Sequence, residues 1–452
     1  MIATALVAAV SVLAAAPQQQ TASLGGSWEG NVSVGGQSLR MVLRVDTSGD
    51  APRAAIDSPD QGANGLSVEG LDLRDGTVRF AVPTASARFE GRLSEDGRTI
   101  TGALTQGGSL PLILTRTTET ATVARPARPQ TPAPPYPYRE EEARIPTPTA
   151  GVELAGTLTL PQGDGPFPAA LLITGSGQQD RDETLFDHKP FAVIADALTR
   201  RGVAVLRVDD RGVGGSTGDP IGATTADFAV DAGAAFAWLA AHQGIDANRV
   251  GLIGHSEGGT IAPLVAQAGQ PVAFMVLIAG PAVSGAEVLT SQSQRIQQAS
   301  GLPATIVESN TAIQRRLMEA IAANAGDADA AAEAVRTAAA GLPPAAIQNA
   351  EQTARRPWMR WFVAHDPAPS LTAYRGPLLA LYGGKDVQVD AQQSATALAA
   401  IRPDARIETF PELNHLMQTA TTGLPAEYPT IEETFDPAAL QALVDWVVTN
   451  SR

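Results

Sequence analysis

The sequence predicts an α/β protein preceded by a small all-β domain. From residue 139 onward, apolar runs typical of strands alternate with helical stretches. Such alternation indicates a mostly parallel sheet covered on both faces. Residues 24–116 instead alternate apolar and polar side chains with period two, and the proline-rich stretch 117–138 separates the two regions. We therefore expect an active site beyond the carboxyl ends of the parallel strands.

Composition limits the classes of function. The chain has 452 residues and is 44% hydrophobic, which is enough for two or three domains with a sizeable core. Its formal net charge is −15, and no basic patch of the kind that binds nucleic acid occurs. Cysteine is absent, so thiol nucleophiles, disulfides and cysteine-ligated metals are excluded together. Catalysis must use oxygen or nitrogen groups.

The N-terminus has the pattern of a signal peptide. Residues 1–16 form an apolar run that ends in three alanines before a polar segment. We expect export to the periplasm or the medium. The rival interpretation is a frayed cytoplasmic N-terminus, because the first residues carry no Lys or Arg and Pro17 follows the expected cleavage site. No later run reaches the ~18 apolar residues needed to span a bilayer, so no stable membrane insertion is expected. The oligomeric state stays open, a homo-oligomer included.

Residues 24–116 predict an antiparallel sheet closed into a small barrel or a sandwich. Alternating segments such as 39–45 and 77–82 are separated by Gly, Asp and Ser turns. Asp96 and Gly97 are predicted to form the tip of a hairpin. The region contains no catalytic set, so its expected role is structural or accessory.

The pentapeptide at 254–258, Gly-His-Ser-Glu-Gly, carries the most chemical information. It lies between the apolar run 249–253 and the helical stretch 259–267. A strand that turns sharply into a helix at Gly-x-Ser-x-Gly is the nucleophile elbow, in which the serine has a strained backbone and small residues flank it two positions away. A simple turn in a glycine-rich chain is the alternative. The strand before and the helix after favour the elbow, which makes Ser256 the candidate nucleophile.

The remaining pattern predicts an α/β-hydrolase fold with a helical cap. The strand before Ser256 is counted as the fifth, as in α/β-hydrolases. The alternation of strands and helices stops at about residue 284 and resumes after about residue 366. That Ala- and Gln-rich insertion lies between the sixth and seventh strands and has helical periodicity. Strands are expected at 152–160, 169–173, 203–208, 249–253, 273–278, 378–382 and 407–410, and helices at 191–200, 225–242, 392–400 and 437–449.

A serine nucleophile needs a base and an acid that orients the base. In α/β-hydrolases the chain order is Ser, then Asp or Glu, then His. Of the five histidines only His365 and His415 follow Ser256. His365 precedes the seventh strand and hence every suitably placed acid. His415 follows the last strand, so we expect it to be the base rather than a surface-loop histidine.

Two aspartates compete for the role of the acid. Asp386 follows the strand 378–382 directly, where the first turn points toward the elbow. Asp390 lies four residues farther on, where it is placed to cap the helix 392–400. We expect Asp386 to be the acid.

The oxyanion hole should combine the backbone N–H of Glu257 with one from the loop after the third strand. That loop, residues 174–181, begins Thr-Gly-Ser-Gly-Gln. Ser176 is the first choice for the second donor. Gly177 and Gln178 remain open as alternatives.

Other residues are given structural interpretations first. Asp209 and Arg211 are expected to form a buried pair that stabilises a turn, and His255 to be packed or hydrogen-bonded locally. An apolar cluster at the cap exit is either cap core or a wall of the acyl pocket. Its members are Trp358, Met359, Trp361 and Phe362.

Several motifs together resemble a known family. They are Ile-Thr-Gly-Ser-Gly at 173–177, the run 180–184 that leads to His-Lys-Pro-Phe at 188–191, Asp-Asp-Arg-Gly-Val-Gly-Gly-Ser at 209–216, and the elbow. From 138 to 452 the chain resembles bacterial α/β-hydrolase carboxylesterases near the prolyl-oligopeptidase-like serine hydrolases. Some of these enzymes carry an N-terminal β module that opens like residues 26–30. The resemblance implies Ser256, Asp386 and His415 as the triad.

The expected function is that of an exported serine carboxylesterase. It would hydrolyse small-molecule short-chain acyl esters through an acyl-enzyme, without a metal or organic cofactor. A peptidase or acyl-transferase is the rival within the fold, although a dedicated peptidase of that branch usually carries a propeller, for which the β region is too short. A glycan-binding or cell-wall-binding protein with an inert hydrolase domain is the rival from another class.

Overall fold

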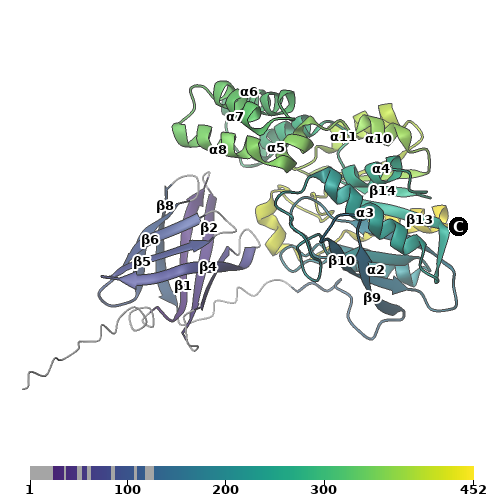
Figure 1. Cartoon of the computed structure of the whole chain (residues 1–452), viewed down its shortest axis with the longest axis horizontal. Helices are drawn as coiled ribbons and strands as arrows, with labels where there is room; N and C mark the ends of the chain where they lie inside the picture. The colour runs from purple at the N-terminus through teal and green to yellow at the C-terminus, as the bar shows by residue number, and fades with distance from the viewer. Residues whose placement is uncertain are drawn as a thin grey trace, which may run out of the picture. The chain divides into compact units, whose positions relative to one another are not determined.

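The computed structural model describes residues 24–34, 37–47, 53–58, 63–82, 87–105, 109–117 and 127–452. The predicted signal peptide, residues 1–16, lies outside them. The chain divides into two compact units, Met1–Arg125 and Pro126–Arg452 (Figure 1). This division falls within the stretch 117–138 expected to be a linker.

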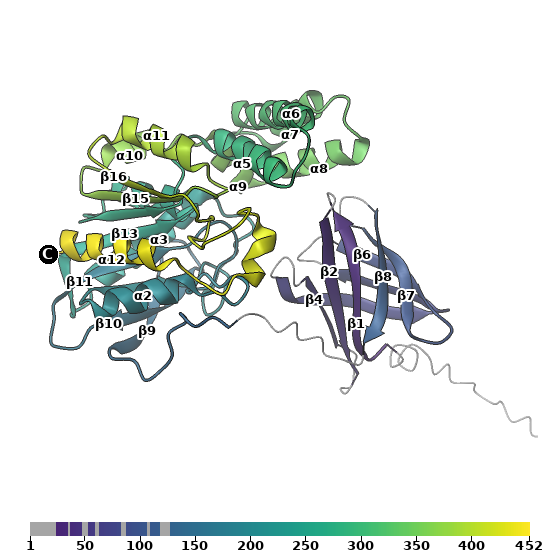
Figure 2. The same ribbon diagram turned by 180° about the vertical axis from the view of Figure 1, so that it is seen from behind.

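The first unit is a closed antiparallel barrel, so of the two predicted forms the barrel is the one observed (Figure 2). Each strand pairs with the next along the chain, and β1 also pairs with β8, which closes the sheet. Trp28 and Phe89 fill its core, and the indole N–H of Trp28 donates to the Leu24 carbonyl. The strands are β1 (Gly26–Val34), β2 (Gln37–Asp46), β3 (Arg53–Ser58), β4 (Ala63–Arg74), β5 (Thr77–Val82), β6 (Ala87–Leu93), β7 (Thr99–Thr105) and β8 (Ser109–Thr117).

The second unit is built on an eight-stranded sheet in the order β16-β15-β14-β13-β11-β12-β10-β9. β10 pairs antiparallel with both β9 and β12. All other neighbouring strands of the sheet pair parallel, from β12 and β11 through β13, β14 and β15 to β16. This is the mostly parallel sheet that the strand–helix alternation predicts. The strands are β9 (Arg139–Pro146), β10 (Glu153–Leu160), β11 (Phe167–Ile173), β12 (Ala204–Val208), β13 (Ile245–His255), β14 (Met275–Ile278), β15 (Leu378–Gly383) and β16 (Arg406–Phe410).

Helices cover both faces of this sheet, because consecutive strand residues point to opposite faces. Leu171 of β11 packs into one core with α3 and α4, whereas its neighbour Leu172 packs into the other with α2 and α12. The covering helices are α2 (Pro190–Arg200), α3 (Thr225–Ala240), α4 (Gly258–Gln267), α11 (Ala391–Ile401) and α12 (Pro437–Asn450).

The first strand and the segment before it differ from the sequence expectation. β9 is not among the predicted strands, because its run of charged residues lacks an apolar pattern and only Ala143 and Ile145 are fully buried. Residues 127–138 pack on the second unit rather than spanning a gap. Arg128 donates to the carbonyls of Phe186 and Pro429, at 2.9 Å and 3.0 Å.

The cap consists of helices inserted between β14 and β15, as predicted. Its first helix begins at a capping box in which Ser284 and Glu287 bond each other's backbone N–H. Met318, Ile321 and Val335 form a small core within the cap. The cap helices are α5 (Gly285–Ala299), α6 (Ala304–Ala323), α7 (Ala328–Ala338), α8 (Pro344–Arg355) and α9 (Pro357–Ala364), followed by α10 (Ala368–Ala373). Among the described residues, no helix has both the length and the apolar character to cross a bilayer.

Candidate active site

Ser256 lies at the sharp turn from β13 into α4. Its φ of +51° is in the left-handed region, and its backbone N–H donates to the Ile278 carbonyl at 2.9 Å. A Cβ on Gly254 would come within 2.1 Å of the Gly258 carbonyl oxygen, and one on Gly258 within 2.2 Å of the Ile173 oxygen. Only glycine fits at these two positions, which is the steric requirement of a nucleophile elbow.

His415 and Asp386 form a buried pair. Nδ1 of His415 lies 2.7 Å from Oδ2 of Asp386, and the aspartate is fully buried at the end of β15. The other oxygen, Oδ1, accepts the backbone N–H groups of Gln388 and Val389. An ionised carboxylate only accepts hydrogen bonds, so Nδ1 of His415 carries the proton and Nε2 is left as the basic nitrogen.

Ser256 and His415 line one pocket of about 360 Å³. Within the described part of the chain, the Ser256 hydroxyl makes no hydrogen bond. In structures without substrate, the bond between nucleophile and base is often long and tightens only in the complex. The pocket therefore brings together the predicted nucleophile and base, and the base in turn contacts the predicted acid.

Asp390 has a different environment. Its Oδ1 accepts the Gln393 N–H at 3.1 Å, which caps α11, and its Oδ2 lies 3.1 Å from Nη1 of Arg295. This is the capping position that the sequence predicts for it.

The loop after β11 leaves backbone N–H groups available beside Ser256. The Gly175 N–H donates to Glu183, and the Gln179 N–H donates to Asp210. Between them, the N–H groups of residues 176–178 donate to none of the described residues, and neither does that of Glu257 at the start of α4. Of residues 176–178 only Ser176 lines the pocket that contains Ser256 and His415. Ser176 therefore remains the predicted second oxyanion donor.

Two of the four apolar residues at the cap exit form a wall of the pocket. Trp358 and Phe362 line it with their rings stacked, the centroids 4.9 Å apart. Met359 packs into the cap core instead, and Trp361 stacks on His365 at 4.4 Å. The cluster divides because successive residues of α9 face different directions. Further apolar lining comes from Leu185, Val288, Leu289, Val389 and Leu416.

The acidic residues among the described lining residues of the pocket are hydrogen-bonded to other protein groups. None of the described lining residues is Lys or Arg, and the two carboxylates are those of Glu183 and Glu257. Oε1 of Glu257 accepts the Thr225 hydroxyl at 2.6 Å and the Trp358 indole N–H at 2.8 Å. The other polar lining includes the amides of Gln179, Gln292 and Gln388 beside two serines and two histidines.

His255 is packed and hydrogen-bonded, as expected, but its partners are distant in the sequence. Its Nδ1 lies 2.8 Å from Glu183 Oε1 and its Nε2 lies 3.0 Å from the His415 carbonyl, partners 72 and 160 residues away in the sequence. Burial alone would lower the pKa of His255, but the Glu183 carboxylate and the His415 carbonyl hold it above its ordinary value. Sequence reasoning assigned Glu183 no role of its own, although it lies in the run 180–184 that carries the family resemblance. It follows residues 174–181, the predicted oxyanion loop.

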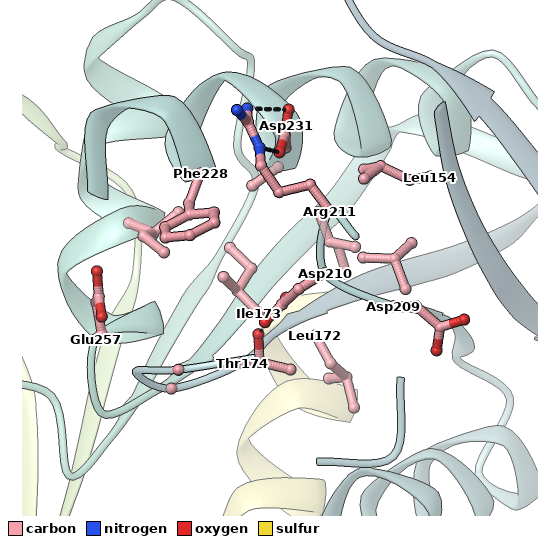
Figure 3. Close-up of a pocket in the computed structure, with 16 residues that line it drawn as sticks. Leu154, Leu172, Ile173, Thr174, Asp209, Asp210, Arg211, Phe228, Asp231 and Glu257 are labelled. Carbon is pink, nitrogen blue, oxygen red and sulfur yellow. Dashed lines mark hydrogen bonds and ion pairs between the residues drawn. The ribbon is translucent and has the colours of Figure 1, made fainter. Parts of the chain in front are cut away.

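Asp209 and Arg211 do not pair with each other, contrary to expectation. Arg211 points to Asp231, with Nε and Oδ2 2.7 Å apart, whereas the Asp209 carboxylate faces away from it (Figure 3). Asp209 binds the Arg181 guanidinium, 2.9 Å from Nη2, and the Gly215 N–H. The turn places the two side chains on opposite sides, so each finds a partner on another element.

A second, smaller cavity of about 40 Å³ lies next to the oxyanion loop (Figure 3). Asp210 lines it and accepts the Thr174 hydroxyl at 2.8 Å and the Gln179 N–H at 3.0 Å. Burial raises the pKa of Asp210 to about 7, and the nearby carboxylates Glu183 and Glu257 add to the rise. Among the described residues, no three His, Cys, Asp or Glu side chains are grouped to hold a metal ion.

Comparison with known proteins identifies the family to which this part of the chain is similar. Residues 150–416 match the family described as X-Pro dipeptidyl-peptidase (S15 family). The chain is also 29% identical over 299 residues to Esterase EstD of Thermotoga maritima. That alignment covers 65% of this chain and 65% of the relative, so it spans slightly less than two thirds of the relative's length.

Solved structures similar to this chain are more distant. One is EstE1, a thermostable carboxylesterase from a metagenomic library, with 17% identity, coverage of 72% of this chain and 94% of that one, and a TM-score of 0.44. Another is proline iminopeptidase from Mycobacterium smegmatis, with 16% identity, coverage of 69% and 99%, and a TM-score of 0.42.

Proposed function

The chain belongs to the X-Pro dipeptidyl-peptidase (S15) family, and on that premise we propose that it is a serine hydrolase that cleaves carboxylic esters. The observation that carries the proposal is the 2.7 Å contact between His415 Nδ1 and Asp386 Oδ2, with Ser256 on its strained turn in the same pocket as His415. A correctly oriented base in the same pocket as a serine hydroxyl is the minimum that acyl transfer requires.

In the proposed reaction, Ser256 Oγ attacks the acyl carbon while His415 Nε2 takes its proton. Asp386 stabilises the resulting imidazolium. The N–H groups of Glu257 and Ser176 hold the negative oxygen of the tetrahedral intermediate. His415 then returns the proton to the departing alcohol, which leaves an acyl-enzyme. A water molecule attacks this ester in the same way, and the carboxylic acid and free Ser256 are regenerated.

The pocket supports a preference for uncharged esters with short acyl chains. The stacked rings of Trp358 and Phe362, together with aliphatic side chains from α5, form apolar walls around a volume of about 360 Å³. Such walls favour an acyl group over a charged one. A short chain fits this volume without displacing the cap.

Peptidase activity is the second candidate, since the family name refers to it. Release of an N-terminal dipeptide requires recognition of the substrate's ammonium, for which a free carboxylate is the natural partner. The two carboxylates that line this pocket already bind protein groups, Glu183 with His255 and Glu257 with Trp358. This argues for an ester, and the esterase name of the Thermotoga maritima relative agrees.

The deciding experiment compares p-nitrophenyl esters from acetate to laurate with an X-Pro p-nitroanilide. We expect turnover of the short esters and little of the anilide. Ser256→Ala should remove activity, by up to about 10⁶ in kcat, with the circular dichroism spectrum unchanged. A fluorophosphonate should label wild type and not the variant. Preference for the anilide would point to a peptidase, and no turnover at all to a binding protein.

We also propose that the protein is exported, on the basis of the apolar run at residues 1–16. N-terminal sequencing of the mature protein should then begin shortly after residue 16. A mature chain that starts at Met1 would contradict export.

A further inference from the structure

A buried pair, Glu183 and His255, has no step in the proposed reaction, yet it contacts the loops that perform it. Glu183 follows the oxyanion loop, and His255 immediately precedes Ser256. The exposed fractions of the two residues are 4% and 6%. The His255 and His415 rings lie with centroids 4.8 Å apart.

The contacts form a continuous chain from the oxyanion loop to the base. Glu183 Oε1 accepts the Gly175 N–H at 2.7 Å and lies 2.8 Å from His255 Nδ1. Nε2 of His255 lies 3.0 Å from the His415 carbonyl oxygen. A carbonyl only accepts hydrogen bonds, so Nε2 carries a proton. His255 therefore donates to the backbone of the base.

The pair is neutral as a whole, which allows it to be buried. One proton lies between His255 Nδ1 and Glu183 Oε1, and because Oε1 also accepts the Gly175 N–H, the ionic form, imidazolium with carboxylate, is favoured. The other acids acting on the pair are Asp386, which also raises the His255 pKa, and Asp210 beside Glu183.

The local backbone fits closely around this pair. Glu183 has a φ of +53°, a left-handed conformation that non-glycine residues adopt where the surroundings enforce it. A Cβ on Gly175 would lie 3.2 Å from Glu183 Oε1 and 3.2 Å from Ser256 Cβ. The oxyanion loop thus packs against the carboxylate and the nucleophile at once, and a movement of Glu183 would move that loop.

We propose that Glu183 and His255 are positioning residues that hold the oxyanion loop and the His415 backbone in register with Ser256. This inference rests on the proposed serine-hydrolase function. The pair touches no reacting atom. It acts through Gly175 on one side and His415 on the other.

The test uses Glu183→Gln, His255→Gln and the double variant in the full-length chain. Each single change should lower kcat by about 10- to 100-fold with KM nearly unchanged, because small misplacements of catalytic groups cost this much. Glutamine keeps the shape of Glu183 and can still accept the Gly175 N–H. Because the two residues act as one unit, the double variant should be about as impaired as the worse single variant.

The pH profile separates positioning from mere support of the fold. His255→Gln leaves an ionised Glu183 without its counter-charge near His415, which raises the pKa of the base. The acid limb of kcat/KM should therefore move to higher pH. Glu183→Gln leaves no such carboxylate, so its acid limb should not move upward.

Asp231→Asn is the matched control. The Arg211–Asp231 pair is as buried as the Glu183–His255 pair, with side-chain exposures of 6% and 7% against 8% and 5% for His255 and Glu183. Asp231→Asn should lower the melting temperature and leave kcat and the pH profile as in wild type. The inference is overturned if Asp231→Asn loses as much kcat as the Glu183 and His255 variants. It is also overturned if both single variants keep the wild-type kcat and the wild-type acid limb of kcat/KM.

Labelling of Ser256 by a fluorophosphonate distinguishes this inference from the ester proposal. Its rate depends on the nucleophile, base and oxyanion groups and needs no natural substrate. If wild type is labelled but hydrolyses no ester, the ester proposal fails, and slower labelling of the two single variants still supports the pair. Equal labelling of wild type and variants, or no labelling of wild type, would refute the inference.

Discussion

The indole N–H of Trp358 donates to the carboxylate of Glu257 at 2.8 Å, which joins the cap to the residue after the nucleophile. Thr225, the first residue of α3, donates its hydroxyl to the same oxygen at 2.6 Å. Glu257 is almost fully buried, with 3% of its surface exposed. The backbone N–H of Glu257 is also the first proposed oxyanion donor. The position of α9 is therefore coupled to the position of that donor.

Trp358→Phe should lower kcat/KM by about tenfold. The change keeps an aromatic ring stacked on Phe362 and removes only the N–H that bonds Glu257, and a hydrogen bond to a charged group contributes about 1.5–3 kcal/mol. Steady-state kinetics on p-nitrophenyl butyrate measures the effect. Trp361→Phe, on the same helix, is the control because that ring stacks on His365. An equal loss in both variants would show that the bond has no role of its own.

Asp386→Asn should lower kcat by roughly 10⁴, because an amide favours the wrong tautomer of His415. Asp390→Asn should remain within a few-fold of wild type, since asparagine caps a helix as well as aspartate does and the side chain binds Gln393 and Arg295 rather than the base. Initial rates at saturating ester, with melting temperatures for both variants, provide the comparison. The opposite ranking would transfer the role of acid to Asp390.

Asp210→Asn should flatten the pH dependence of stability between about pH 4 and pH 7. Burial raises the pKa of Asp210 to about 7 in the folded protein, so the folded state binds more protons than the unfolded state in this window. Stability contributed by this group is therefore present at low pH and is lost as pH rises, by at most about 1.4 kcal/mol per pH unit. Above pH 7 the loss is complete.

The measurement is urea unfolding of wild type and Asp210→Asn from pH 5 to pH 8. Asparagine can keep both contacts, because the Thr174 hydroxyl accepts as well as donates. The variant should gain stability relative to wild type as pH rises. A constant difference across the range would mean that Asp210 is ionised throughout.

The parts of the site that sequence reasoning identified are those governed by local rules. The glycines beside Ser256 follow from the steric demand of one turn, and the capping role of Asp390 from the start of one helix. The order of nucleophile, acid and base is a property of the topology, so Asp386 and His415 follow once the strands are counted. Each inference needs only neighbouring residues or the order of elements.

The parts that were missed depend on side chains that packing brings together from distant positions. Glu183 meets His255 across 72 residues, and Arg211 reaches Asp231 on α3 rather than its neighbour Asp209. Whether a residue of α9 faces pocket or cap core depends on how that helix is rotated. Hydrophobic periodicity cannot separate these outcomes, because both sides of α9 are apolar.

A chain that begins at Pro126 should fold and keep wild-type kcat/KM on short esters, whereas one that begins at Tyr136 should be less stable. The proposed catalytic groups all lie in the second unit. Residues 126–135 hold Arg128, which donates to the carbonyls of Phe186, Pro429 and Ile431. They also hold Gln130, which accepts the N–H groups of Thr434 and Phe435. Loss of these bonds leaves several backbone groups unsatisfied, at a cost of about 1–3 kcal/mol each where they stay buried.

Melting temperature and kcat/KM of both truncated chains test this, with Arg128→Ala in the full-length chain as the matched variant. Because Arg128 supplies three of the lost contacts, this single change should reproduce much of the instability of the shorter chain. Equal melting temperatures for the two truncated chains would mean that residues 126–135 are a spacer after all. The chain from Pro126 lacks only the barrel and retains Arg128, Gln130 and every proposed catalytic residue. If it loses more than tenfold in kcat/KM, about 1.4 kcal/mol of transition-state binding, the barrel is part of the catalytic unit.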